Sequence, residues 1–289
     1  MAGEDSRIVA VCGATGRQGG AVARSVLRRG WHVRALTRKP QRADALARLG
    51  AEVVRADMND PASLRAAFDG AHGVYSVQNG MISGFDREVA QGRAVADAAK
   101  ACGVAHLVFG SASKGIAGTG VPSWETKVVI EDHIRSLDLP YTMLRPTAFM
   151  ELMTDKKFYP AVGTWRIWPK LTGETRPIPW LAVDDLGEIA AIAFERPDEF
   201  AGKELMLAAD LQSLAQCRAI YEETMGKKPP SFPMPQRLFD TFTRNDVTTM
   251  WRWLRDGELP VDTATVRSIL PSAMSVRDWL ARQRDHERG

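Results

Sequence analysis

The folds open to this chain are restricted above all by a glycine-rich turn near the N-terminus, which lies between a short apolar run and a helical segment. Residues 8–12 are apolar, residues 13–19 follow the spacing Gly-x-x-Gly-x-x-Gly, and residues 21–29 have a helical composition. In such a unit the glycines allow a tight turn, a close approach of the backbone to a pyrophosphate, and close packing of helix on strand. The helix N-terminus then offers N–H groups and a partial positive charge to phosphate. The turn therefore predicts a dinucleotide-binding fold.

The first half of the chain alternates short apolar runs with helical segments. Each run has the length and composition of a buried strand, and helices of roughly 10 to 15 residues connect them. The expected strands are 8–12, 32–37, 52–56, 73–77, 106–110 and 141–144, and the expected helices are 21–29, 41–49, 61–68, 87–102 and 124–136. Such alternation produces right-handed crossovers between parallel strands. We predict an α/β fold with a Rossmann-type, doubly wound parallel sheet.

The pattern changes after residue 146. Residues 150–181 are rich in proline and tryptophan and show little periodicity. Beyond them we expect a short strand over 204–208 and helices over 213–225, 236–254 and 275–284. The sequence therefore predicts a nucleotide-binding domain over 1–150 and a smaller, mostly helical substrate or lid domain over 151–289. The helix expected over 183–194 is predicted to return to the first domain.

Composition excludes several classes of protein. Of the 289 residues, 45% are hydrophobic and 25% are charged, as in an ordinary globular protein. The net charge of +3 does not favour direct binding to nucleic acid or to a membrane surface. The three cysteines form no CxxC pair and have no histidine at metal-ligand spacing, and no signal-peptide pattern occurs. We expect a soluble, cytoplasmic protein without a metal site.

The end of the second expected strand indicates which dinucleotide binds. An acidic residue at this place would hold the ribose 2′-hydroxyl of NAD. Residues 36–39 read Leu-Thr-Arg-Lys and contain no carboxylate. The guanidinium of Arg38 can bind a 2′-phosphate, and Lys39 and Arg17 can add positive charge. The alternative interpretation is a solvated basic turn; the pattern favours NADP(H).

Several motifs together resemble the NmrA-like family, which consists of atypical relatives of the short-chain dehydrogenases/reductases. The motifs are Gly-Ala-Thr-Gly-Arg-Gln-Gly-Gly over 13–20, Leu-Thr-Arg over 36–38, Gln-Gly-Arg over 91–93, Leu-Arg-Pro-Thr-Ala-Phe-Met-Glu over 144–151, and the segment 271–280. The resemblance implies that the cofactor is contacted by Gly13, Thr15, Gly16, Arg17, Gln18, Gly19, Thr37, Arg38, Asp57 and Met58. It also implies that Gln78 and Asn79 flank the middle of the cofactor and that Lys127 approaches the nicotinamide ribose.

The catalytic residues of the wider superfamily are only partly present. Its typical members use Tyr-x-x-x-Lys, in which the tyrosine exchanges a proton with the substrate. Here Lys127 has Ser123 at the tyrosine position, so the expected acid is missing. Lys127 is a candidate either for catalysis or for cofactor binding alone. Ser111 matches the superfamily's serine position, and a structural strand-end hydroxyl is the alternative role. Trp165, Trp168 and Trp180 could line an aromatic pocket or pack in a core.

These residues lead to two hypotheses about function. The first is an NADPH-dependent reductase of a quinone-like, aromatic or conjugated acceptor, because such acceptors spread negative charge and do not need a strong positioned acid. The second is a non-catalytic NADP(H) redox sensor that acts through a regulatory protein partner. Association with DNA through such a partner is a third and weaker alternative. The expected partner is a small-molecule acceptor or a regulatory protein, and a homodimer is a candidate assembly.

Overall fold

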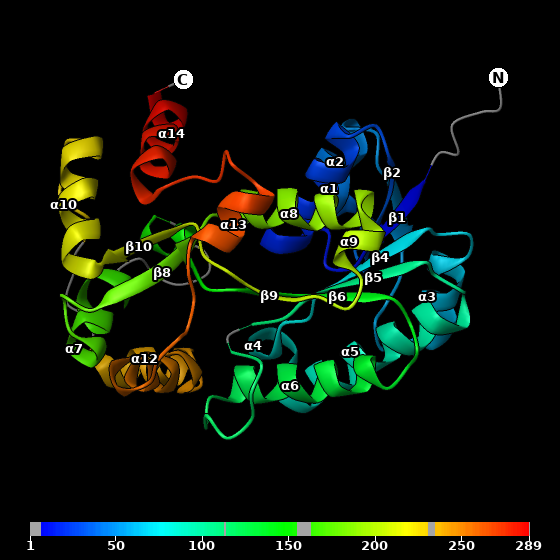
Figure 1. Ribbon diagram of the computed structural model, residues 1–289, viewed down its shortest axis with the longest axis horizontal. Coiled ribbons are helices and arrows are strands. Elements are labelled where there is room, and N and C mark those ends of the chain that lie inside the picture. The colour runs from blue at the N-terminus through cyan, green and yellow to red at the C-terminus, as the bar shows by residue number, and fades with distance from the viewer. Residues whose placement is uncertain (1–6, 113, 155–162, 231–234, 289) are drawn as a thin grey trace. The chain divides into compact units, whose positions relative to one another are not determined.

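The computed structural model describes residues 7–112, 114–154, 163–230 and 235–288 (Figure 1). The chain divides into two compact units. The first unit comprises Met1–Ile116, Ser123–Arg145 and Leu186–Leu205, and the second comprises Ala117–Pro122, Pro146–Asp185 and Met206–Gly289. Both units are discontinuous in sequence. The sequence pattern predicts a boundary between residues 150 and 151, with only the helix expected over 183–194 returning to the first unit.

The first unit is built on a seven-stranded sheet with the strand order β3-β2-β1-β4-β5-β6-β9. The strands are β1 (Ile8–Val11), β2 (His32–Thr37), β3 (Glu52–Arg55), β4 (Gly73–Ser76), β5 (His106–Gly110), β6 (Tyr141–Pro146) and β9 (Glu204–Leu207). All pairings from β3 through β6 are parallel. This arrangement confirms the predicted Rossmann-type, doubly wound fold. The prediction for 204–208 was wrong in one respect, because this strand lies beside β6 in the main sheet and not in a separate domain.

Helices cover both faces of this sheet (Figure 1). They are α1 (Arg17–Arg28), α2 (Asp44–Arg48), α3 (Pro61–Phe68), α4 (Gly80–Ser83), α5 (Phe85–Ala101), α6 (Pro122–Arg135), α8 (Val183–Glu195) and α9 (Pro197–Phe200), with a 3-10 turn η1 at Pro40–Ala43. Figure 1 shows α1, α2 and α8 on one face and α3, α5 and α6 on the other. Glu188 on α8 accepts a hydrogen bond from Ser25 on α1 over 2.9 Å and pairs with Arg29 over 2.7 Å. These contacts join α8 to the helix that follows the glycine turn.

The central strands are buried on both faces, as a covered parallel sheet requires. Val9, Ala10 and Val11 of β1 are fully buried, and every residue of β5 is buried as well. Because both faces are apolar, these strands read as continuous hydrophobic runs in the sequence. The polar residues that matter for function accordingly lie just beyond the strand ends.

The second unit contains a three-stranded sheet with the order β10-β8-β7, in which β10 is antiparallel and β7 parallel to β8. Its strands are β7 (Ala148–Phe149), β8 (Pro177–Leu181) and β10 (Asp210–Ser213). Its helical segments are η2 (Met150–Met153), η3 (Gly163–Ile167), α7 (Trp168–Thr172), α10 (Leu214–Met225), α11 (Gln236–Phe242), α12 (Asp246–Asp256), α13 (Ala264–Ile269) and α14 (Val276–Arg288). The unit is therefore largely helical.

The single helix predicted over 236–254 is wrong, because the structure breaks it into α11 and α12. Arg244 and Asn245 adopt left-handed backbone conformations with φ of 52° and 60°. The Asn245 N–H donates to the Asp240 carbonyl over 2.8 Å, which ends α11 in a turn. Asparagine tolerates this conformation better than most residues, and Asn245 directly precedes the first residue of α12.

Several tryptophans of the second unit are buried in its core. Trp165, Trp168 and Trp180 are 2%, 1% and 0% exposed. Trp168 stacks on Trp251 with ring centroids 4.9 Å apart, and Phe239 stacks on Trp251 at 5.4 Å. Of the two roles considered for the first three tryptophans, this burial supports core packing.

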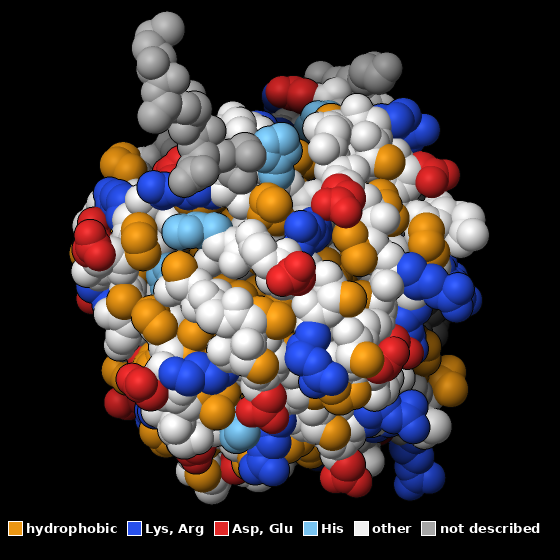
Figure 2. Space-filling model, turned by 90° about the vertical axis from the view of Figure 1, so that its right-hand side faces the viewer, with side chains coloured by type: hydrophobic (Ala, Val, Ile, Leu, Met, Phe, Trp, Pro, Cys, Tyr) orange, Lys and Arg blue, Asp and Glu red, His pale blue; other side chains and the backbone are white. Residues whose placement is uncertain are grey.

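Surface and composition features agree with an ordinary globular chain. On the face in Figure 2, acidic and basic side chains are interspersed, and no broad patch of one sign is visible among the residues described there. Within the described ranges, no helix has the length and apolar character needed to cross a membrane. The described residues likewise contain no cluster of three or more His, Cys, Asp or Glu side chains placed to hold a metal ion.

Candidate functional site

The glycine turn between β1 and α1 has the geometry of an anion site. Gly13 has a φ of +63°, and its carbonyl accepts a hydrogen bond from the Gly16 N–H over 2.8 Å. A Cβ on Gly19 would lie only 2.4 Å from the Gly13 carbonyl oxygen, so glycine is required there for the helix to start so close to the turn. No side chain of the described residues caps α1, and its first turn holds no acid. The helix N-terminus therefore keeps N–H groups available for a phosphate.

The end of β4 lies directly beside this turn. A Cβ on Gly13 would be 3.2 Å from Val77 Cγ1. The Tyr75 hydroxyl donates to Gln18 Oε1 over 3.2 Å, and burial raises the pKa of Tyr75. Because Tyr75 occupies the amide oxygen of Gln18, the Gln18 side chain is left to present its NH2 group.

Arg38 lies at the carboxyl end of β2 with its side chain exposed. Thr37 Oγ1 accepts the N–H of Lys39 over 3.1 Å, which fixes the turn that carries Arg38. The guanidinium makes no hydrogen bond or ion pair with any residue that the structure describes. At the next strand end, Asp57 Oδ1 accepts from both the N–H and the amide group of Asn59, over 2.9 Å and 2.7 Å. Asp57 therefore does not neutralise Arg38, which remains available for an anion.

Gln78 carries an unsatisfied acceptor in the same region. Its side chain is 5% exposed, and Nε2 donates to Ser76 Oγ over 2.9 Å and lies 3.7 Å from Met58 Sδ. Its Oε1 is buried and has no donor among the described residues. A buried acceptor without a partner is costly, so this atom is suited to accept a hydrogen bond from a ligand. Asn79 instead uses its Oδ1 to cap α4, accepting from the Met81 N–H over 3.0 Å.

Lys127 lies on α6 and is 6% exposed. Its Nζ donates to the Gln78 carbonyl over 2.9 Å and pairs with Glu88 Oε1 over 3.0 Å. The ammonium also lies 5.3 Å from the centre of the Phe109 ring. The structure therefore brings Lys127 to the end of β4, next to Gln78; its approach to a nicotinamide ribose stays a prediction. Ser123 is one helical turn earlier on α6.

Sequence patterns did not identify Glu88, the ion-pair partner of Lys127. Glu88 is in the first turn of α5 and is 1% exposed. Thr126 Oγ1 donates to its Oε2 over 2.6 Å. One signal could have identified it, because Glu88 shares the helix face of Gln91, Gly92 and Val95, all of which are buried. A carboxylate on a buried face requires a partner.

Ser111 follows β5 and belongs to a different network. Its hydroxyl donates to Glu131 Oε1 over 2.6 Å, and Arg145 donates to Glu131 through both Nε (2.8 Å) and an Nη atom (2.6 Å). Ser111 is 2% exposed and Glu131 is fully buried. The single proton of the hydroxyl is thus bonded within the protein, which supports the structural role. The catalytic role of Ser111 stays a prediction.

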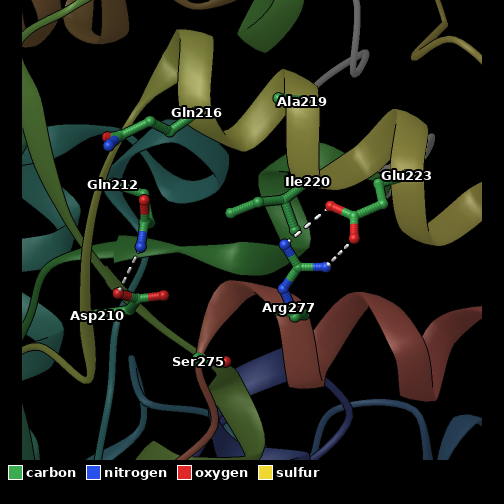
Figure 3. Close-up of a pocket in the computed structure, with 8 residues that line it drawn as sticks. All are labelled: Asp210, Gln212, Gln216, Ala219, Ile220, Glu223, Ser275 and Arg277. Atoms are coloured by element: carbon green, nitrogen blue, oxygen red, sulfur yellow. Dashed lines mark hydrogen bonds and ion pairs between the residues drawn. The ribbon is translucent and has the colours of Figure 1, made fainter.

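The second unit holds an open cavity of about 450 Å³ (Figure 3). It is lined by Asp210, Gln212, Gln216, Ala219, Ile220, Glu223, Ser275 and Arg277. Figure 3 shows Arg277 paired with Glu223, with Nη1 2.8 Å from Oε1. Asp210 accepts from Gln212 Nε2 over 3.1 Å and from the Val276 N–H over 2.9 Å. Each of the three charged residues of the lining therefore already has a partner within the protein.

The fold and the glycine turn define a protein of the Rossmann-type, doubly wound class. The chain belongs to the NmrA-like family, since the model of that family matches residues 5–270. The family predicted from the sequence motifs is therefore confirmed. The NmrA-like family domain-containing oxidoreductase FrzB of Cladobotryum sp is 33% identical over 250 residues, which cover 76% of this chain and 74% of FrzB. The corresponding oxidoreductase malD of Malbranchea aurantiaca is 28% identical and covers 96% of both chains.

Solved structures share the fold at lower sequence identity. NmrA, a negative transcriptional regulator solved in complex with NADP, has a TM-score of 0.80 at 20% identity and covers 98% of this chain and 97% of its own. The Citrobacter sp. triphenylmethane reductase complexed with NADP(H) has a TM-score of 0.76 at 20% identity and covers 96% of this chain and 100% of its own. An NADPH-dependent quinone oxidoreductase from Escherichia coli has a TM-score of 0.70 at 20% identity, covering 95% and 99%. These likenesses support the fold.

Proposed function

We propose that this protein is an NADPH-dependent reductase of a quinone-like, aromatic or conjugated acceptor. The observation that carries the proposal is Arg38, which has no partner among the described residues and lies at the sheet edge where the N-terminus of α1 has no side-chain cap. The curated relatives FrzB and malD are named oxidoreductases, and two proteins of the same fold are a dye reductase and a quinone reductase. NmrA and the triphenylmethane reductase are solved with NADP or NADP(H).

The residues present fit NADP(H). Backbone N–H groups of the glycine turn would hold the pyrophosphate, Arg38 would pair with the 2′-phosphate, and Lys127 would donate to the nicotinamide ribose. Gln78 Oε1, buried without a partner among the described residues, would accept a hydrogen bond from the cofactor. The proposed contact residues are Gly13, Thr15, Gly16, Arg17, Gln18, Gly19, Thr37, Arg38, Asp57, Met58, Gln78, Asn79 and Lys127.

The side chains near Lys127 determine which acceptors are suitable. When bound, NADPH supplies a hydride. Reduction of a simple ketone needs an acid at the developing alkoxide, and Ser123 stands at the position where related enzymes have a tyrosine. A conjugated acceptor spreads the charge and can take its proton from water or from Lys127. The protein then has mainly to hold the acceptor in place. We propose that residues 151–289 supply most of that acceptor site.

An NADP(H) sensor is the second candidate function. The Lys127 ammonium pairs with Glu88, and the Ser111 hydroxyl donates to Glu131. Neither group is therefore an evident proton donor to a substrate. NmrA, which has the same fold, is described as a negative transcriptional regulator. A sensor would change its surface when the cofactor binds, for example over residues 79–86, and would act through a protein partner.

The test is NADPH oxidation measured against quinones, triphenylmethane dyes, enones and simple ketones. A reductase of the proposed kind turns over members of the first three groups and leaves simple ketones nearly unchanged. Lys127→Ala should lower turnover, Lys127→Arg should restore part of it, and Lys100→Ala, an exposed lysine on α5, is the control. Efficient reduction of an unactivated ketone would contradict the proposed chemistry. No turnover of any acceptor, with tight NADPH binding and protection of residues 79–86 from proteolysis, would favour the sensor.

A further inference from the structure

The ion pair between Lys127 and Glu88 is almost completely buried, with side-chain exposures of 7% and 2%. Taking either charge out of water alone would be strongly unfavourable, so each requires the other. Glu88 uses both of its oxygens. Oε1 pairs with Lys127 Nζ, and Oε2 accepts from Thr126 Oγ1 over 2.6 Å. Two successive residues of α6 therefore hold this one carboxylate of α5.

The hydrogen bonds of Lys127 leave one donor unused. An ammonium has three N–H groups. One is directed to Glu88 and one to the Gln78 carbonyl; for the third, the described residues offer no oxygen or nitrogen acceptor, only the face of the Phe109 ring with its centre 5.3 Å from Nζ. Because the three bonds of an ammonium are tetrahedral, fixing two of them also fixes the direction of the third. The orientation of the unused donor thus depends on Glu88.

The segment after β4 also packs on Glu88. A Cβ on Gly80 would lie 2.5 Å from Glu88 Oε2, so the backbone at Gly80 is in close contact with the carboxylate. Gln78, whose carbonyl binds Lys127, is two residues earlier in the same segment. Glu88 therefore holds both the ammonium of Lys127 and the backbone that carries its second acceptor.

We infer that Glu88 is a positioning residue that holds Lys127 with its third N–H available to the nicotinamide half of NADP(H). This inference rests on the proposed function. The side chain of Glu88 bonds to α6 and, within the described residues, makes no hydrogen bond or ion pair with the glycine turn or with Arg38. Its effect should be confined to the nicotinamide half and should not extend to the 2′-phosphate.

The test compares two ligands by calorimetry. NADPH contains both halves of the cofactor, and adenosine 2′,5′-bisphosphate contains the adenosine 2′-phosphate but no nicotinamide ribose. Glu88→Gln keeps the size of the side chain and removes its charge. We expect this variant to bind NADPH about tenfold more weakly, as for the loss of a charge-assisted hydrogen bond. Its affinity for adenosine 2′,5′-bisphosphate should be unchanged. Lys127→Met should likewise lower the affinity for NADPH and not that for adenosine 2′,5′-bisphosphate. The double variant Glu88→Gln/Lys127→Met should bind NADPH only slightly more weakly than Lys127→Met alone.

Two further variants serve as a control and as a second way to disturb Glu88. Asp97→Asn removes an exposed carboxylate from α5, outside residues 79–86, and should change neither affinity. Thr126→Val removes the second hydrogen bond to Glu88 while keeping both charges. It should lower the affinity for NADPH by less than Glu88→Gln does and leave the affinity for adenosine 2′,5′-bisphosphate unchanged. It replaces Glu88→Gln as the deciding variant if that protein does not fold.

The outcomes separate this inference from the proposed function. Equal losses for both ligands would show a general structural role and overturn the inference, as would wild-type NADPH affinity in both Glu88→Gln and Thr126→Val. In either case the proposed function would stand. Failure of the wild type to bind either ligand would overturn the proposed function together with the inference.

Discussion

Ser111 Oγ donates to Glu131 Oε1 over 2.6 Å, and both side chains are buried, one just after β5 and the other within α6. Arg145 donates to the same carboxylate from β6. Arg135 and Arg145 also pair with Glu204 on β9, where the hydrogen bond from Arg135 is the largest cause that lowers the pKa of Glu204 to about 2. Ser111 is thus bonded to a charge network that links α6, β6 and β9.

Ser111→Ala should mainly change stability. Removing the hydroxyl leaves a buried carboxylate with one hydrogen bond fewer, which should lower the free energy of unfolding by about 1–3 kcal/mol. Turnover of any active acceptor should fall by less than about threefold. Urea denaturation and NADPH oxidation measure the two effects, with Ser136→Ala, an exposed serine that follows α6, as the control. A large loss of turnover at unchanged stability would instead support the catalytic role of Ser111.

Arg38→Ala should remove the preference for NADPH over NADH. A charge-assisted bond to the 2′-phosphate contributes about 1.5–3 kcal/mol, so NADPH should bind at least about tenfold more weakly to the variant while NADH is unaffected. Arg48→Ala changes an exposed arginine at the end of α2 and serves as the control for net charge. Equal affinity of the wild type for the two cofactors would show that Arg38 is an ordinary surface residue.

Gly16 and Gly19 should respond differently to alanine. A Cβ on Gly19 meets the Gly13 carbonyl oxygen at 2.4 Å, whereas on Gly16 it meets the same atom at 3.2 Å. Gly19→Ala must therefore displace the backbone of the turn and should lower both thermal stability and NADPH affinity. Gly16→Ala should keep nearly wild-type stability. Any loss of NADPH affinity in this variant should come from contact of the new methyl group with the phosphates. Calorimetry with thermal unfolding tests the pair, and a Gly19→Ala protein of unchanged melting temperature would contradict the packing argument.

His106 should make the protein less stable in mild acid. Burial is the main cause that lowers the pKa of His106 to about 4, while the unfolded chain titrates near 6.5. Below pH 6.5 the unfolded state binds a proton that the native state does not, so the free energy of unfolding falls as the pH decreases toward 4, by roughly 3 kcal/mol in total. His106→Asn should remove this dependence. Denaturation at pH 7.5, 6.0 and 5.0 compares the two proteins, and parallel pH profiles would contradict the prediction.

Glu151 should make the protein less stable as the pH rises, which is the opposite of the effect of His106. Burial is the main cause that raises its pKa to about 7, and its carboxyl group lies 3.1 Å from the Val183 N–H at the start of α8. A carboxyl group with a raised pKa in the native state contributes stability that is complete below about pH 4.5 and is lost as the pH rises through 7. Glu151→Gln should lack this contribution, so its stability should fall less than that of the wild type as the pH rises from 5 to 8. The test is the melting temperature of both proteins between pH 5 and 8. An equal change of melting temperature with pH in the two proteins would show that Glu151 is not its cause.

Features that depend on near neighbours in the chain could be predicted from the amino-acid sequence. The strand, glycine turn and helix over 8–29 follow from apolar runs, glycine spacing and helical composition within about twenty residues. The absence of a carboxylate at 36–39 and the presence of Arg38 are equally local. For this reason the parallel sheet and the family could be predicted from the order of residues alone. The preference for NADP(H) was inferred from the same local residues.

The contacts between side chains that are distant in the sequence became known from the folded structure. Glu88 and Lys127 are 39 positions apart, and Ser111, Glu131 and Arg145 come from three different parts of the fold. The strand at Glu204–Leu207 reads as part of a later domain in the sequence, yet it pairs in the main sheet beside β6. Local periodicity identifies an element but carries no information about its spatial neighbours. Buried charges select their partners through packing and desolvation, and both arise only when the whole chain has folded.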